Sequence, residues 1–300
     1  MLKALLGVAR LNFLTLTVIC ITLAASFSWY RHGVFSAGLF SLVLLMALAA
    51  HISVNAFNEY FDFKSGLDFL TNKTPFSGGS GSLISQPSAA SAALVLACSC
   101  LLLVIISGLY LTIQLGWSLL LIGIPGVLLI YAYTQYINRS PLLCLLAPGV
   151  GFGFFMTLGA SWVFSAELSS GAAVLAAVIT CLVSNLLLLN QFPDVDADRQ
   201  VGRRHYPIVI GRQRSAVVFS LLLLLSYLLL PIAVTTGLLP PHCLLALLTL
   251  PLAAKLLPGI FRNADTHSQL TPYLALNVAL VHSLPLLVAL GLLWAAPLNV

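Results

Sequence analysis

Long runs of apolar residues follow one another along the whole chain, with short polar stretches between them. Each run holds about 20 residues, the length of α-helix that crosses a hydrocarbon core about 30 Å thick. The runs are continuous and not alternating, so they predict helices and not the strands of a transmembrane barrel. Nine spans are expected, at roughly residues 12–30, 34–61, 86–112, 116–136, 141–163, 171–192, 214–236, 240–260 and 270–296.

The composition supports the same fold class. Of the 300 residues, 60% are hydrophobic and only 7% are charged, whereas about 25% of the residues in a typical soluble domain are charged. We therefore expect an all-α, polytopic transmembrane helical bundle that forms a single domain over residues 1–300. The six cysteines lie in apolar runs without the spacing of a zinc site, so they are interpreted as buried apolar side chains.

The positive charges distinguish the two sides of the predicted bundle. With nine spans, twelve of the 13 lysines and arginines fall on the side of the N-terminus, and only Arg31 falls on the other. Cationic loops mark the cytoplasmic face, so this side is predicted to be cytoplasmic in a bacterial-type inner membrane. All four tryptophans fall at the opposite ends of their spans, as an outer interfacial belt would. This topology explains the net charge of +5, so no nucleic-acid partner is expected.

Two loops on the predicted cytoplasmic side are longer than the others, at residues 62–85 and 193–213. They follow the second and the sixth span, and Asn58 precedes Asn190 by 132 residues. Such a period suggests a duplicated four-helix unit. The pseudo-repeats would cover about 12–136 and 141–260, with a ninth helix at about 270–296.

Amides and carboxylates gather where the first of these loops leaves its helix. In the segment NAFNEYFDFKSGLD, Asn58 and Asp62 are four residues apart, so they share one face of a helix. Asp68 follows six residues later, beyond Gly66, where the helix is expected to break. The first motif therefore combines a helix face with the loop that follows it.

The second long loop begins in the same way. In the segment NQFPDVDADR, Asn190, Asp194 and Asp198 are spaced by four and line one face of a continuous helix. Asp196 points elsewhere on such a helix. Pro193 can start a turn or kink this helix, so the register depends on what the proline does.

The two motifs offer oxygen atoms as ligands. Like charges this close repel one another and need cations between them. An oxygen-only set suits Mg²⁺, which keeps several waters and bridges to the phosphates of a substrate. The predicted metal ligands are Asn58, Asp62, Asp68, Asp194 and Asp198, with Asn190 beside them.

Basic residues in the same two loops can bind the phosphate oxygens that a metal leaves free. Lys73 lies in the first loop, and Arg199, Arg203 and Arg204 lie in the second. The Gly-rich segment SGGSG at 77–81 can offer backbone N–H groups to phosphate, or it can simply be a flexible turn. The sequence therefore predicts a site for a metal-bound diphosphate.

Both acidic motifs resemble those of the UbiA superfamily of intramembrane prenyltransferases. Asn58, Asp62 and Asp68 match the first motif of that family, with the longer final gap of the branch that prenylates dihydroxynaphthoate for menaquinone. Asp194 and Asp198 match the second motif. The resemblance spans roughly residues 5 to 290.

Three arginines extend the resemblance beyond the aspartates. The segment DADRQVGRRHYPIVIG resembles the end of the second motif and places Arg203 on its basic position. The segment YAYTQYINRSPL resembles a loop whose basic residue helps to hold diphosphate, and Arg139 is the match. Arg10 resembles an N-terminal arginine of the family. The chain departs from the family pattern at Gln191, at His205 and after Arg139, where LLCLLAPGVG replaces a glycine–glutamate signature.

The resemblance implies transfer of a prenyl group from an isoprenyl diphosphate to an aromatic, quinone-precursor-like acceptor within the membrane, with Mg²⁺ as cofactor. The aspartates would hold Mg²⁺ against the leaving diphosphate, and Asp198 or Asp68 would take the proton of the acceptor. The isoprenoid tail would lie along the bundle and leave sideways into membrane lipid. The aromatic residues that can stabilise an allylic cation are Tyr131, Tyr133, Phe152 and Phe155.

Two other functions compete with prenyl transfer. An intramembrane terpene cyclase of the same superfamily would ionise the same donor without an acceptor. A cation transporter would carry its carboxylates near the middle of the bilayer, whereas these lie at one face. His51 is the only ionisable residue of note in the middle of a span, and it is interpreted as a hydrogen-bonded packing residue.

Overall fold

The computed structural model describes residues 1–71, 73, 74, 76–295 and 297, and every regular element within them is helical. Nine stretches of this described chain are long and apolar enough to cross a membrane. The expected polytopic helical bundle is therefore confirmed. The stretches are Leu2–His32, Ala37–Ser65, Pro87–Leu115, Trp117–Gln135, Pro141–Ser165, Ser170–Asn190, Arg212–Thr235, Pro241–Asn263 and Ser268–Trp294.

Seven spans of the described chain consist mainly of one long α-helix, and the other two are divided between shorter helices of different types. The long helices are α2 (Leu14–His32), α3 (Ala37–Ser65), α5 (Ala90–Leu115), α6 (Leu120–Gln135), α9 (Ser170–Asn190), α12 (Arg212–Thr235) and α14 (His267–Trp294). The fifth span joins α7 (Pro141–Val150), a π-helix at Gly151–Leu158 and α8 (Gly159–Ser165). The eighth joins a 3₁₀-helix at Pro241–Thr249 to α13 (Leu250–Asn263).

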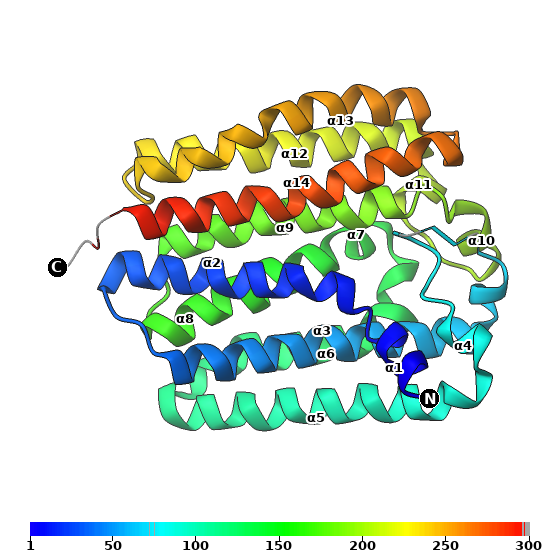
Figure 1. Cartoon of the computed structure of the whole chain (residues 1–300), viewed down its shortest axis with the longest axis horizontal. Helices are drawn as coiled ribbons and strands as arrows, with labels where there is room; N and C mark the ends of the chain where they lie inside the picture. The colour runs from blue at the N-terminus through cyan, green and yellow to red at the C-terminus, as the bar shows by residue number, and fades with distance from the viewer. Residues whose placement is uncertain (72, 75, 296, 298–300) are drawn as a thin grey trace.

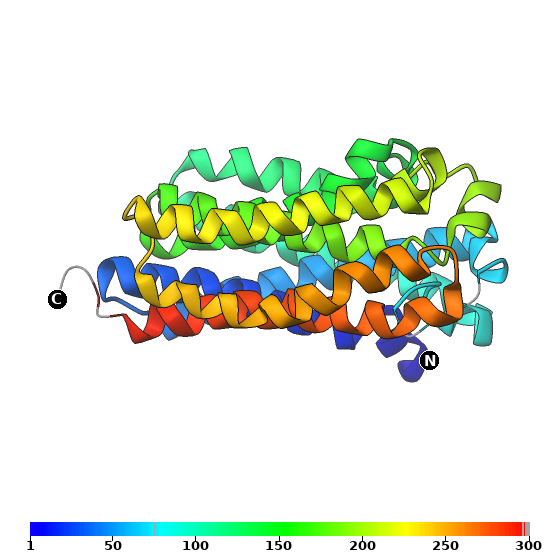
Figure 2. The ribbon, with the colours of Figure 1, turned by 90° about the horizontal axis from the view of Figure 1, so that it is seen from above.

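The long helices run side by side, and most of the short ones gather at one end (Figure 1). Figure 2 shows the same bundle from above. Helix α3 packs against α5, α9 against α12, and α14 against α2. The short helices at the N-terminal end are α1 (Leu2–Val8), α4 (Ser82–Ser85), α10 (Val195–Gln200) and α11 (Tyr206–Val209). The last turn of α14 lies at the opposite end, as an odd number of spans requires, while the four-helix repeat stays a prediction.

Helix α9 forms the centre of the main core. It is the most buried of the spans in the described chain, and Leu182, Leu188 and Phe192 have almost no exposed surface. Two glycines let the fifth span approach α9 closely. A Cβ atom would lie 2.3 Å from the carbonyl oxygen of Thr180 at Gly149, and 2.3 Å from that of Ala176 at Gly153. Small residues four apart allow such contacts between membrane helices, where packing drives association.

Candidate active site

A cavity of about 660 Å³ runs through the bundle and collects both predicted motifs at one end. Asn58, Asp62 and Asp68 line it from one side, and Asn190, Asp194 and Asp198 line it from the other. Further along, its walls are mostly apolar side chains of α3, α5, α6 and the π-helix, including Leu111, Phe155 and Met156. The cavity therefore has a polar end next to the long loops and an apolar interior.

The first motif is built on the end of α3. Asn58 and Asp62 lie on the last turns of this helix, and both line the cavity, as their spacing predicts. The expected break at Gly66 is confirmed, because α3 ends at Ser65 and Gly66 has a φ of 82°, which favours glycine. The chain then makes a 3₁₀ turn at Leu67–Phe69, and this turn returns Asp68 to the cavity.

The second motif is not the continuous helix that its spacing suggested. Helix α9 ends at Asn190, residues 191–194 form a turn, and α10 begins at Val195. Pro193 lies in this turn, so the proline ended the helix instead of kinking it. Asn190, Asp194 and Asp198 still line the cavity. The side chain of Asp196 is 76% exposed and lies outside it, as expected.

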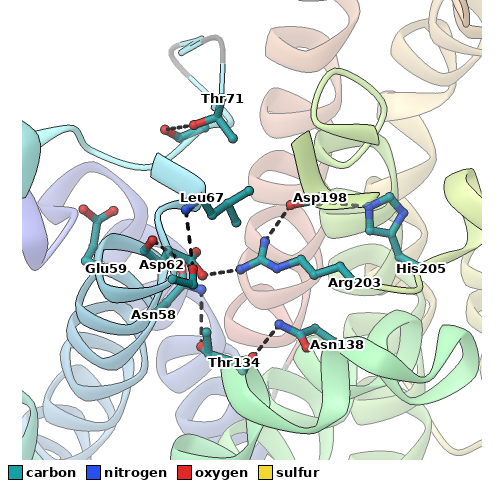
Figure 3. Close-up of polar contacts among 12 residues, drawn as sticks. Asn58, Glu59, Asp62, Leu67, Thr71, Thr134, Asn138, Asp198, Arg203 and His205 are labelled. Carbon is teal, nitrogen blue, oxygen red and sulfur yellow. Dashed lines mark hydrogen bonds and ion pairs between the residues drawn. The ribbon is translucent and has the colours of Figure 1, made fainter. Parts of the chain in front are cut away.

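Arg203 joins the two motifs (Figure 3). Its Nη2 donates to Asp62 Oδ1, and its Nη1 donates to Asp198 Oδ1 over 3.0 Å. His205 Nε2 lies 2.9 Å from the other oxygen of Asp198. Burial lowers the pKa of Arg203, but the carboxylates of Asp62 and Asp198 outweigh it and raise that pKa above its usual range. A single guanidinium thus pairs with one carboxylate from each motif.

The other predicted basic residues divide into two groups. Arg10 lines the cavity together with Arg203. In the described chain, the remaining four do not line the cavity, and their side chains are exposed. Their proposed contact with diphosphate stays a prediction. These four residues are Lys73, Arg139, Arg199 and Arg204.

Two polar residues of the site were missed by the sequence reasoning. Asn138, the neighbour of Arg139, lines the cavity, and its backbone oxygen accepts a hydrogen bond of 3.0 Å from the Arg204 amide. Glu59, the neighbour of Asn58, is buried and binds Arg10 and Ser80. Both residues are adjacent in sequence to a predicted site residue. This adjacency was the one feature of the sequence that could have identified them.

The aromatic residues predicted to stabilise an allylic cation also fall into two groups. Tyr133, Phe152 and Phe155 line the cavity. Tyr131 does not line it, because its ring packs edge-on against Phe57 and is 45% exposed. His51 lines the cavity wall and forms a 2.8 Å hydrogen bond with Thr17, in agreement with its interpretation as a hydrogen-bonded residue.

Several buried oxygens at the polar end accept no hydrogen bond from the described residues. They are Asp68 Oδ2, Asn190 Oδ1 and Asp194 Oδ1. Burial, with the nearby Glu59 and Asp62 carboxylates, raises the pKa of Asp68 to about 7. Burial and the carboxylate of Asp198 raise the pKa of Asp194 to about 7. Buried acceptors without donors, close to like charges, are groups that a cation would stabilise.

The donor set therefore fits a hard divalent cation such as Mg²⁺, because it consists of carboxylate and amide oxygens. Among the described residues, no three acidic, histidine or cysteine side chains stand close enough together to hold an ion in the present arrangement. The guanidinium of Arg203 occupies one oxygen of Asp62 and one oxygen of Asp198, where it would compete with a metal ion.

Fold and site together define a helical membrane protein with a buried acidic site at one end of its bundle. The chain belongs to the UbiA prenyltransferase family, which matches residues 18–284. The resemblance seen in the two motifs is thus confirmed, and the chain is a transferase of this family. A cation transporter is no longer a competing interpretation.

Curated relatives cover most of the chain at low identity. The 1,4-dihydroxy-2-naphthoate octaprenyltransferase of Bacillus subtilis is 26% identical over 231 residues, which are 75% of this chain and 72% of the relative. The chloroplastic 2-carboxy-1,4-naphthoquinone phytyltransferase of Arabidopsis thaliana is 26% identical over 259 residues, or 81% and 64% of the two chains. The digeranylgeranylglyceryl phosphate synthase of Natronomonas pharaonis is 27% identical over 222 residues, or 69% and 72%.

Solved structures share the fold. The UbiA homologue of Aeropyrum pernix superposes with a TM-score of 0.72 at 17% identity, over 93% of this chain and 96% of that one. The homologue of Archaeoglobus fulgidus, solved with dimethylallyl diphosphate (DMAPP) and Mg²⁺, superposes with a TM-score of 0.61 at 12% identity, over 95% and 98%. At these identities the likeness supports the fold, and the bound groups are properties of the homologue.

Proposed function

We propose that this protein transfers a prenyl group from an isoprenyl diphosphate to an aromatic acceptor of the naphthoate type, with Mg²⁺ as cofactor. The observation that carries the proposal is the cavity itself, whose polar end collects both acidic motifs and whose interior is apolar. A diphosphate fits the first part and an isoprenoid chain fits the second. The names of the Bacillus and Arabidopsis relatives support an acceptor of the naphthalene class.

The polar end would bind the donor through its phosphates. Asp62, Asp68, Asp194 and Asp198, with Asn58 and Asn190, would hold Mg²⁺. Bound there, Mg²⁺ would neutralise the charge that develops on the leaving diphosphate. Arg10 and Arg203 line the same end and would donate hydrogen bonds to phosphate oxygens that the metal leaves free.

The interior of the cavity would protect the reacting carbon. Cleavage of the bond between carbon and diphosphate oxygen leaves an allylic cation, which water would quench, and apolar walls keep water away. The rings of Tyr133, Phe152 and Phe155 line this region and can face the cation. Attack by the acceptor ring forms the new carbon–carbon bond, and the ring proton passes to a base, for which Asp68 and Asp198 are the two candidates.

The proposal includes an orientation. The polar end would face the cytoplasm of a bacterial-type cell, in its inner membrane, because the positive charges of the loops concentrate on that side. The donor and the acceptor would then reach the polar end from the cytoplasm or from the inner leaflet. The prenylated product would leave into membrane lipid.

The test is product analysis with purified protein in lipid nanodiscs. The protein is incubated with Mg²⁺, a panel of prenyl diphosphates that includes geranyl diphosphate (GPP), and acceptors that include 1,4-dihydroxy-2-naphthoate. Mass spectrometry should detect an acceptor that carries a prenyl group. A hydrocarbon formed equally without acceptor would identify a terpene cyclase, and a prenylated glyceryl phosphate would overturn the aromatic acceptor.

A further inference from the structure

Glu59 is an acidic residue next to the first motif whose oxygens are already occupied. Its side chain has no exposed surface. Glu59 Oε1 accepts hydrogen bonds from Arg10 Nε at 2.9 Å, from Arg10 Nη2 at 2.6 Å and from the Ser80 amide at 2.7 Å. Glu59 Oε2 accepts a bond of 2.6 Å from Ser80 Oγ. A buried carboxylate is stable only if charged or hydrogen-bonding groups compensate it, and Arg10 and Ser80 supply these groups.

These bonds connect α3 to two other segments of the chain. Arg10 lies at the break between α1 and α2 and has a left-handed backbone, with a φ of 51°, which is uncommon for a residue other than glycine. Its Nη2 also lies 3.3 Å from Asn58 Oδ1. The tight bond to Glu59 compensates for the unfavourable backbone and keeps Arg10 at the cavity wall.

Ser80 belongs to the Gly-rich loop, residues 77–81, which touches both motifs. Ser77 and Gly78 line the cavity with Asp194 of the second motif, and their polar groups partly offset the rise in the pKa of Asp194. On the other side, a Cβ atom at Gly79 would lie 2.8 Å from Asp68 Oδ1 of the first motif. The loop therefore crosses the polar end of the cavity, and Ser80 is the point at which Glu59 fastens it to α3.

We propose that Glu59 is a positioning residue that holds the Gly-rich loop and Arg10 against the two motifs, so that their donors stand ready for the donor diphosphate. The proposal rests on the proposed function, which supplies the diphosphate. Glu59 acts through Arg10 and Ser80 and does not ligate the metal. A metal ligand would have to release the bonds from these two residues first.

The test compares Glu59→Ala, Glu59→Gln and Ser80→Ala. Alanine removes every bond, and we expect KM for GPP to rise by about 10- to 100-fold, since charge-assisted bonds are lost, while KM for the acceptor stays unchanged. Glutamine can still accept from Arg10 and from the Ser80 amide, so it should recover most of the loss. Ser80→Ala should give a smaller rise in the same constant. Glu167→Ala, which removes an exposed acid in the loop between α8 and α9, is the matched control.

A second measurement needs no turnover. The Ser80 amide and the Ser80 hydroxyl both donate to Glu59. Hydrogen–deuterium exchange of residues 77–81 should therefore quicken in Glu59→Ala, which loses both bonds, quicken less in Ser80→Ala, which loses only the hydroxyl bond, and stay slow in Glu59→Gln. Binding of GPP, measured by calorimetry with Mg²⁺, should weaken in Glu59→Ala and in Ser80→Ala and change little in Glu59→Gln. If the wild-type protein bound GPP but transferred no prenyl group, the proposed function would fail while these two measurements still decided the role of Glu59.

Three results would overturn the proposal. One is an Ala variant with unchanged loop exchange and unchanged GPP affinity. Another is a Gln variant as impaired as the Ala variant, with a raised Mg²⁺ requirement in both, which would make Glu59 a metal ligand. The third result is unchanged hydrogen–deuterium exchange in Ser80→Ala. If Glu59→Ala does not fold, Ser80→Ala and Glu59→Gln still test the proposal.

Discussion

Replacing Arg203 by alanine tests the link between the two motifs. Arg203 donates to Asp62 and Asp198 in the free protein and lines the end of the cavity where the diphosphate would bind. A hydrogen bond from a guanidinium to a charged acceptor contributes roughly 1.5–3 kcal/mol, which is on the order of 10- to 100-fold. Because the side chain of Arg203 is only 18% exposed, water does not replace this bond easily.

We therefore expect Arg203→Ala to raise KM for the prenyl diphosphate and to lower kcat, with little effect on KM for the acceptor. Lysine at this position keeps the charge but loses the two-pronged guanidinium, so Arg203→Lys should recover only part of the loss. The assay is steady-state kinetics with donor and acceptor varied separately. Arg214→Ala, an exposed arginine at the start of α12, is the control and should behave like the wild type.

The Arg203→Ala substitution should also change the thermal stability of the protein in the absence of substrate. Removing the guanidinium leaves Asp62 and Asp198 without their shared cation, so the free protein should lose thermal stability. Mg²⁺ should then raise its unfolding temperature more than it raises that of the wild type, because the metal no longer competes with Arg203. If Arg203→Ala raised only KM for the acceptor, Arg203 would belong to the aromatic pocket and this reasoning would be refuted.

Three further predictions concern the metal, the membrane orientation and the packing of α9. Asp62→Ala and Asp194→Ala should each lower turnover by at least ~10²-fold, whereas Asp196→Ala should not; EDTA should abolish activity and Mg²⁺ restore it, and full activity in either variant would exclude the two-motif site. Reporters fused to the two ends should read cytoplasmic at the N-terminus and external at the C-terminus; equal signals would mean a miscounted span. Gly153→Ala, whose Cβ would lie 2.3 Å from a backbone oxygen, should cost about 1–3 kcal/mol of stability, seen as a lower unfolding temperature than in Gly38→Ala, where the Cβ meets nothing within 4 Å.

The helices could be predicted from the sequence because a membrane span needs a long apolar run, and nine such runs stand apart along the chain. The ends of the helices could not be predicted as closely. The second span was expected to stop at about residue 61, but α3 continues to Ser65 and ends where Gly66 adopts a positive φ. Asp62 therefore lies on the helix, as its spacing from Asn58 predicted, although the expected span stopped one residue before it. Polar residues in the last turn of a span do not mark its end.

The members of the site could largely be predicted, whereas its contacts could not. Spacing by four placed Asn190, Asp194 and Asp198 together, yet the helix that justified this spacing is broken by a turn. The bridge through Arg203 and the anchoring role of Glu59 depend on how distant segments meet, which residue spacing does not encode. Arg139 was chosen because it matches a basic position in a loop of the family, but the neighbouring Asn138 lines the cavity.

The bond between Arg203 and Asp62 joins residues 141 positions apart. During synthesis, the second and third spans leave the ribosome long before Arg203 exists. Asp62, at the end of α3, therefore lacks its Arg203 partner until the sixth span and the loop that follows it have emerged. The polar end of the cavity is thus complete only after residue 203 has been synthesised, and a chain released before that point would leave Asp62 without its guanidinium partner.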